Sequence, residues 1–238
     1  MPIFYGIDMT YIIIVLPCIL LSLIASARVN STFNKYSKQL SSRRITGAQA
    51  AERVLMANGV RNVRIERISG NLTDHFDPKT NVIRLSDAVY DNTSTAAIGV
   101  ACHEAGHAVQ YAQSYAPIKL RAAIIPVTNF GSMLAMPLII IGLLLSSAME
   151  YSYTLVYIGI ICFSLSLVFQ LVTLPVEFNA SRRAMAAIDQ AGLLTQEEQT
   201  GARRTLTAAA MTYVAATAVA LAQLLRIILL FGGRRNDD

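Results

Sequence analysis

Hydrophobic positions along the 238-residue chain gather into four long runs separated by polar segments. The runs cover residues 9–27, 126–148, 153–174 and 208–231. A helix of about 20 apolar residues crosses the hydrocarbon layer of a bilayer. The composition agrees with membrane spans, because 54% of the residues are apolar and only 15% are charged. The pattern therefore predicts a mostly α membrane protein with about four transmembrane helices.

The polar segment between the first two runs, residues 29–125, is predicted to form a small α+β portion. Thr46 and Gln49 have the spacing of a capping box, which predicts a helix that ends near Asn58. Short strands are then expected at 63–65 and 72–76, a turn at 77–81 and a returning strand at 82–85. Such a sheet either holds an extended peptide at its edge or only covers the helix that follows it.

The helix predicted after the sheet contains the candidate metal-binding and catalytic residues. Thr95 is predicted to cap it, and it contains His103, Glu104 and His107. Positions i and i+4 lie about 40° apart on a helix, so the two imidazoles converge on one point. Two imidazoles and a third ligand suit Zn²⁺ with one position left for water, and Glu104 is placed to act as general base. A helix that carries two histidines by chance is the weaker reading, since the chain has only 3 His.

Further histidines and cysteines are few. His75 is a spare histidine that we expect at the surface or packed, although it remains a candidate third ligand. The odd number of cysteines, Cys18, Cys102 and Cys162, suggests no disulfide framework. Cys102, although next to a predicted ligand, is expected to pack rather than to bind metal.

Charge predicts the topology. The net charge of +5 comes from basic residues in the segments between apolar runs, so membrane orientation explains it better than nucleic acid does. By the positive-inside rule residues 29–125 are cytoplasmic, and a hairpin over 126–175 returns the chain to that side. The first run lacks the basic residues of a signal peptide and is expected to remain as an anchor.

Glu177 follows the hairpin and is predicted to be the third zinc ligand. Pro175 is expected to redirect the helix at the membrane surface, and Ser181 lies on the same helical face as Glu177. A solvated carboxylate at a helix start is the alternative. An incomplete zinc site on the same side of the membrane favours the ligand. Further on, Gly192 is expected to end this helix, and Arg226 to reach the interface from the last run.

These signals divide the chain into five parts: an anchor (1–28), a cytoplasmic region with the sheet and zinc helix (29–125), a transmembrane hairpin (126–175), cytoplasmic helices with the third ligand (176–207), and a last transmembrane helix with its tail (208–238).

Two motifs resemble a known family. Residues 103–110 (HEAGHAVQ) and 176–184 (VEFNASRRA), together with the hairpin, resemble the YugP-type neutral zinc metallopeptidases of bacterial membranes over nearly the whole chain. The second motif is also similar to the Glu-x-x-Ala-Asp-x-x-Ala pattern of HtpX and the CAAX prenyl proteases. There the Glu is the third zinc ligand, which implies Glu177. Their Asp is Ser181 here, whose hydroxyl can bond an imidazole but adds no negative charge. FtsH proteases, whose third ligand is an Asp, would instead implicate Asp189. Glu177 is preferred because Ala180, Ser181 and Ala184 fit its surrounding motif and nothing comparable flanks Asp189.

The resemblance implies a zinc metalloendopeptidase of the HExxH, gluzincin-like type, with a zincin-like cytoplasmic portion. His103, His107 and Glu177 would hold Zn²⁺, Glu104 would be the base, and Arg182 or Arg183 would stabilise the oxyanion or face lipid phosphates. The expected partners are the bilayer and a peptide or membrane-protein substrate, with no nucleic acid. The expected location is the bacterial plasma membrane, with the active site on the cytoplasmic side.

A membrane scaffold or adaptor with a structural or inactive zinc site is the alternative function. A transporter is disfavoured because the apolar spans carry almost no ionisable residues.

Overall fold

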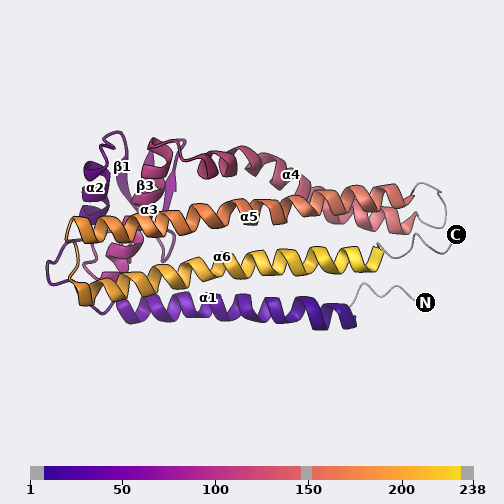
Figure 1. Cartoon of the computed structure of the whole chain (residues 1–238), viewed down its shortest axis with the longest axis horizontal. Helices are drawn as coiled ribbons and strands as arrows, with labels where there is room; N and C mark the ends of the chain where they lie inside the picture. The colour runs from indigo at the N-terminus through magenta and orange to yellow at the C-terminus, as the bar shows by residue number, and fades with distance from the viewer. Residues whose placement is uncertain (1–7, 146–151, 232–238) are drawn as a thin grey trace. The chain divides into compact units, whose positions relative to one another are not determined.

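A computed structural model describes residues 8–145 and 152–231 (Figure 1). The described chain is mostly helical. A π-helical turn, Tyr11–Val15, leads directly into α1, and a small sheet lies between α2 and α3. The elements are α1 (Leu16–Tyr36), α2 (Gly47–Ala57), β1 (Arg64–Ile68), β2 (His75–Asp77), β3 (Val82–Ser86), α3 (Thr95–Ala112), α4 (Ala116–Leu144), α5 (Ser152–Gln190) and α6 (Gln196–Phe231).

Four of the described helical segments are long and apolar enough to cross a membrane. They are Tyr11–Tyr36, Ala116–Leu144, Tyr153–Gln190 and Gln196–Phe231, with mean hydropathies of 2.5, 1.9, 2.4 and 2.2. This confirms the predicted mostly α membrane protein. α5 continues through Pro175 instead of breaking there, so one helix carries both an apolar span and the motif around Glu177. The short connection predicted between α4 and α5 lies outside the described residues.

The chain forms two compact units. One comprises Met1–Ile24, Leu120–Thr173 and Tyr213–Asp238, as far as these segments are described, and the other comprises Ala25–Lys119 and Leu174–Thr212. The first unit contains most of the apolar span residues. The second contains the sheet, α2, α3 and the polar ends of the long helices, so every predicted metal ligand lies within one unit.

In the first unit, Arg226 has a partner that its sequence position did not reveal. Its guanidinium donates to the Asp8 carboxylate, with an N–O distance of 3.2 Å, and lies 5.3 Å from the centroid of the Tyr11 ring. Asp8 also accepts from the backbone N–H of Tyr11. The charge of Arg226 is therefore neutralised by the protein itself, which lowers the cost of an arginine in an apolar span.

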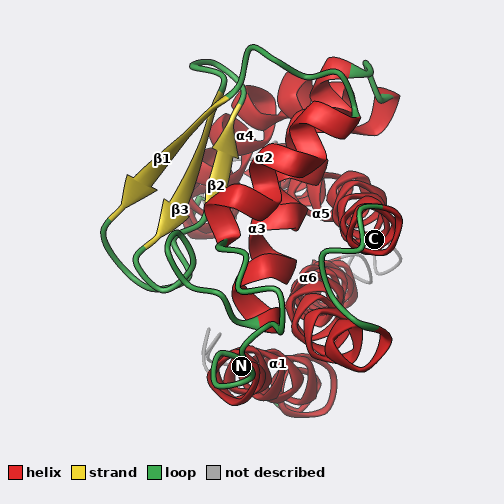
Figure 2. Cartoon of the chain, turned by 90° about the vertical axis from the view of Figure 1, so that its left-hand side faces the viewer, coloured by secondary structure: helices red, strands yellow, loops and turns green. Residues whose placement is uncertain are grey.

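In the second unit, the sheet has the order β1-β3-β2, with β1 parallel and β2 antiparallel to β3. Ile65 and Phe76 both pair with Ile83, so these three apolar side chains share one face. α2 packs against β1 and α3 against both β2 and β3, and Figure 2 shows the two helices on the same side of the strands. The small sheet ahead of the zinc helix is thus confirmed. Its second strand is shorter than the predicted 72–76, since only His75–Asp77 pair with β3.

Side-chain caps fix where the helices of this unit begin. The predicted capping box of α2 is present. The Thr46 hydroxyl accepts from the Gln49 backbone N–H, and Gln49 Oε1 accepts from the Thr46 backbone N–H. α3 differs from the prediction by one residue. Ser94 is its N-cap and accepts from the Ala97 N–H, whereas the Thr95 hydroxyl donates to the Tyr36 carbonyl. Thr95 ties α3 to the end of α1 instead of capping it.

The core of the second unit is built largely on α3. Ala101, Cys102 and Ala105 are fully buried and belong to one hydrophobic cluster with residues of α2, β3 and α5. Burial raises the pKa of the Cys102 thiol, which keeps it protonated. The expectation that Cys102 packs is therefore confirmed. This tight packing fixes the helix that presents His103 and His107.

Candidate metal centre

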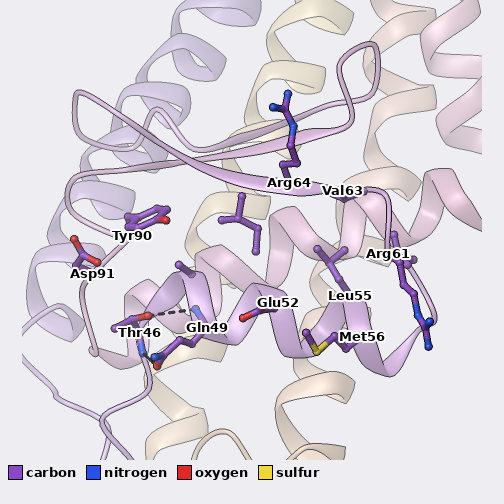
Figure 3. Close-up of a pocket in the computed structure, with 13 residues that line it drawn as sticks. Thr46, Gln49, Glu52, Leu55, Met56, Arg61, Val63, Arg64, Tyr90 and Asp91 are labelled. Carbon is purple, nitrogen blue, oxygen red and sulfur yellow. Dashed lines mark hydrogen bonds between the residues drawn. The ribbon is translucent and has the colours of Figure 1, made fainter.

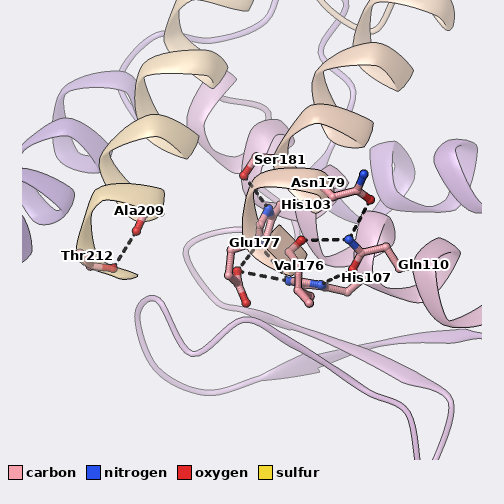
Figure 4. Close-up of polar contacts among 9 residues, drawn as sticks. All are labelled: His103, His107, Gln110, Val176, Glu177, Asn179, Ser181, Ala209 and Thr212. Atoms are coloured by element: carbon pink, nitrogen blue, oxygen red, sulfur yellow. Dashed lines mark hydrogen bonds and ion pairs between the residues drawn. The ribbon is translucent and has the colours of Figure 1, made fainter. Parts of the chain in front are cut away.

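α3 and α5 bring three metal-binding side chains to one point (Figure 4). His103 and His107 lie one turn apart on α3, and their Nε2 atoms are 3.1 Å apart. Glu177 comes from α5, and its Oε2 lies 3.3 Å from His103 Nε2 and 3.5 Å from His107 Nε2. Residues at least 70 positions apart in sequence, on α3 and on α5, therefore bring two nitrogens and one oxygen together.

The three separations fit a tetrahedral metal ion. Zinc binds imidazole nitrogen and carboxylate oxygen at about 2.0–2.2 Å, and a tetrahedron with such bonds has ligand atoms about 3.3–3.6 Å apart. The separations of 3.1, 3.3 and 3.5 Å fall around that spacing. Two imidazoles and one carboxylate are also the ligand set of a catalytic zinc site with a fourth position for water. The residues present therefore fit Zn²⁺.

Negative charge is concentrated around these imidazoles. His107, Glu177 and Glu104 are all buried. Burial opposes protonation of His107, but hydrogen bonding to Glu177 and the charge of Glu104 outweigh it and raise its pKa. Two carboxylates that are costly to bury thus lie near the two imidazoles, and a divalent cation stabilises such a concentration of negative charge.

Asp74, just before β2, adds a third carboxyl group to the neighbourhood of Glu104. Its two oxygens accept from the Ser86 N–H and hydroxyl at 2.7 and 3.0 Å. Burial raises the pKa of Asp74, the Ser86 hydrogen bonds lower it, and the nearby charge of Glu104 raises it again. Asp74, the residue just before the edge strand β2, is therefore close enough to Glu104 for its pKa to be raised by that charge.

The close approach of α3 to α5 depends on Gly106. A Cβ added at Gly106 would lie 2.9 Å from the backbone carbonyl oxygen of Ala180, closer than such atoms pack. Ala180 is fully buried, so the contact has no room to relax outwards. The glycine inside the histidine motif thus lets the helix with two ligands reach the helix with the third.

Gly106→Ala is expected to move α5 away from α3 and weaken zinc binding by about 5- to 150-fold, because an overpacking cost of about 1–3 kcal/mol on the metal-bound geometry corresponds to that range. Competition with a chromogenic chelator measures the affinity. Gly99→Ala is the matched control. A Cβ there meets Ala202 of α6 at 3.2 Å, so thermal stability should fall while zinc affinity is kept. Equal zinc affinity in both variants would contradict this role of Gly106.

The Nδ1 atom of each imidazole lies within hydrogen-bond distance of a neutral side chain. Ser181 Oγ lies 3.2 Å from His103 Nδ1, as its place on the Glu177 face of the helix predicted. His107 Nδ1 lies 3.0 Å from Gln110 Oε1. The sequence prediction missed Gln110. Its spacing of three residues after His107, on the same helical face, was the available signal.

The structure also places the other candidate residues. Arg183 donates to Asn179 Oδ1 at 2.7 Å and Gln113 Oε1 at 2.6 Å, whereas Arg182 is exposed. His75 is exposed on β2, with Nδ1 near the Thr73 carbonyl, and is not in the metal-binding group. Asp189 accepts from the amides of Gln196 and Gln199. The third member of the group is Glu177, and neither His75 nor Asp189 joins it.

A pocket of about 940 Å³ opens between α2 and β1 (Figure 3). Leu55 and Ile65 contribute to its apolar lining, and Arg61 and Asp91 lie at its two ends. The metal-binding group lies elsewhere, because none of its three residues lines this pocket.

Comparison with known proteins agrees with this geometry. The family described as "Putative neutral zinc metallopeptidase" matches residues 11–232. "Putative membrane protease YugP" of Bacillus subtilis (strain 168) is 45% identical over 230 residues, which cover 97% of this chain and 100% of the relative. No solved structure matches the chain. Both matches include the segments of α3 and α5 that form the metal-binding group.

Proposed function

This chain belongs to the family of neutral zinc metallopeptidases, and we propose that it is a membrane-embedded zinc endopeptidase. The observation that carries the proposal is the convergence of His103, His107 and Glu177 within the second unit. A zinc ion held by these residues would lower the pKa of water and polarise the carbonyl of a peptide bond.

Glu104 is the proposed general base. It directly follows a ligand on α3, it is buried, and its charge acts on both His107 and Asp74. A carboxylate in this position accepts a proton from the attacking water and then donates it to the leaving amine. A purely structural zinc site needs no such group, so the position of Glu104 favours an enzyme over a scaffold.

The proposed substrate is an extended peptide segment of a membrane or juxtamembrane protein. β2 is an edge strand, and Phe76 of β2 packs on Tyr111 of α3 with ring centroids 6.1 Å apart. The outward backbone groups of β2 are suited to pair with a peptide alongside the zinc helix. We place the active site on the cytoplasmic side of a bacterial plasma membrane, because the second unit carries the basic segments that the positive-inside rule assigns there. Arg182 and Arg183 remain the proposed oxyanion or headgroup contacts.

Metal removal tests this proposal. Detergent-solubilised full-length protein should cleave an unstructured protein such as casein, lose the activity on treatment with 1,10-phenanthroline, and regain it with one equivalent of Zn²⁺. The physical reason is that only the bound ion can activate water between these three ligands. A zinc-loaded protein with four protein ligands and no cleavage would instead support a structural site in a scaffold.

A further inference from the structure

Gln110 joins the two ligand-bearing helices behind the metal-binding group. Its side chain is fully buried, and both ends of its amide are bonded (Figure 4). Oε1 lies 3.0 Å from His107 Nδ1, and Nε2 donates to the Val176 carbonyl and to Asn179 Oδ1, each at 2.9 Å. We propose that Gln110 is a positioning residue that sets the ring orientation of His107 and its distance from Glu177.

The first part of this role concerns His107. An amide oxygen only accepts hydrogen bonds, so the ring must carry its proton on Nδ1 to bond Gln110. Nε2 then presents its lone pair towards His103 and Glu177, which is the form that binds a metal. The contact selects the binding tautomer and prevents the ring from rotating about χ2.

The second part concerns Glu177. The carbonyl that accepts from Gln110 belongs to Val176, the residue immediately before Glu177 on α5. Val176 is itself fully buried. A carbonyl oxygen has two lone pairs, so Val176 can accept from Gln110 as well as within its helix. The Gln110 amide thus bonds the ring of His107 on α3 and the backbone carbonyl that directly precedes Glu177 on α5.

These two hydrogen bonds, one accepted and one donated, explain why position 110 carries an amide side chain. A carboxylate at position 110 could accept from His107 but would face the Val176 and Asn179 oxygens without a proton to donate. An apolar side chain would leave the buried His107 N–H without this acceptor and would remove the bond that joins α3 to the Val176 carbonyl. Glutamine alone among side chains of this length supplies one acceptor and two donors.

A neighbouring network fixes the direction of the amide. Asn179 Oδ1 accepts from Gln110 Nε2 and from Arg183 Nε, so the Asn179 oxygen must point towards Gln110. Arg183 also donates to Gln113 and lies 5.9 Å from the centroid of the Tyr115 ring. The charged guanidinium therefore holds Asn179 in place, and Asn179 in turn keeps the Gln110 oxygen turned to His107.

The inference rests on the proposed zinc site but is tested without peptidase activity. Gln110→Met keeps the side-chain length and removes every hydrogen bond. Zinc affinity of the full-length protein, measured by chelator competition, should fall about 10–100-fold, as expected when the partner of a ligating histidine is lost. The visible absorption bands of the Co²⁺-substituted protein should shift as well, because the His107 ring is no longer fixed. Gln196→Met, at an exposed glutamine of α6 that donates to Asp189 and lies outside this network, is the control and should leave both readouts unchanged.

Gln110→Glu is the second variant and decides alone if Gln110→Met does not fold. Its carboxylate still accepts from His107 and makes the imidazole a stronger donor, so the Co²⁺ bands should shift while zinc binds more tightly than in Gln110→Met. Co²⁺ bands identical to wild type in Gln110→Glu, or zinc affinity in Gln110→Met within twofold of wild type, would overturn the proposal. Wild-type protein that binds zinc but cleaves no peptide would contradict only the proposed function.

Discussion

Glu104→Gln is expected to reduce peptide cleavage by about 10²–10⁴-fold, the range that general acid–base catalysis contributes. Glutamine has nearly the same volume as glutamate, so the packing of α3 should persist. The amide cannot take a proton from water, and the leaving amine loses its proton donor. Initial rates on a quenched fluorescent peptide measure the effect at equal zinc loading.

The same variant must keep its metal for this result to identify the base. Glu104 is not one of the three residues that converge, so Glu104→Gln should contain as much zinc as wild type. Glu52→Gln, an exposed carboxylate on α2, is the control and should cleave at the wild-type rate. Undiminished cleavage by zinc-loaded Glu104→Gln would rule out Glu104 as the base.

Glu177→Gln is expected to lower zinc affinity by more than about 100-fold, beyond what the loss of an outer hydrogen-bond partner costs. The variant leaves His103 and His107 in place but replaces an anionic oxygen ligand with a neutral amide. A site with only two imidazoles lacks the third ligand that mononuclear zinc sites require. Zinc content after dialysis against a weak chelator, together with activity, measures the loss.

Asp189→Asn is the matched control for Glu177→Gln. Asp189 is the carboxylate on the same helix that the FtsH pattern would select, but its Oδ1 accepts from Gln196 and Gln199. Asp189→Asn should therefore retain zinc and activity. Loss of zinc in Asp189→Asn with retention in Glu177→Gln would reverse the assignment of the third ligand.

The parts of this protein that follow local sequence rules were predictable. Four apolar runs predicted the four helices that are long and apolar enough to span a membrane, because length and hydropathy can be read directly from the sequence. The capping box at Thr46 also follows a short spacing rule, and it is present. The predicted N-cap of α3, Thr95, differs by one residue from the observed N-cap, Ser94, since serine and threonine can each cap a helix. A distant contact from Thr95 to Tyr36 decided between them.

The approach of α3 to α5 was predictable only in part. The resemblance of the second motif to known proteases implied Glu177, and its neighbour Ser181 indeed lies against His103. The role of Gly106 depends on Ala180, 74 positions away, and no local pattern reveals such a contact. The bond from Gln110 to Val176 and the pair of Arg226 with Asp8 are long-range in the same way. Each of these depends on how distant helices pack, which periodicity along the chain does not encode.

X-ray absorption at the zinc edge of the full-length protein tests the central claim most directly. We predict one zinc per chain, coordinated by two imidazoles and by oxygen ligands from Glu177 and water, with no sulfur. The buried, protonated thiol of Cys102 supports the absence of sulfur from this set. A sulfur ligand, a third imidazole, or an unchanged spectrum in Glu177→Gln would contradict the account.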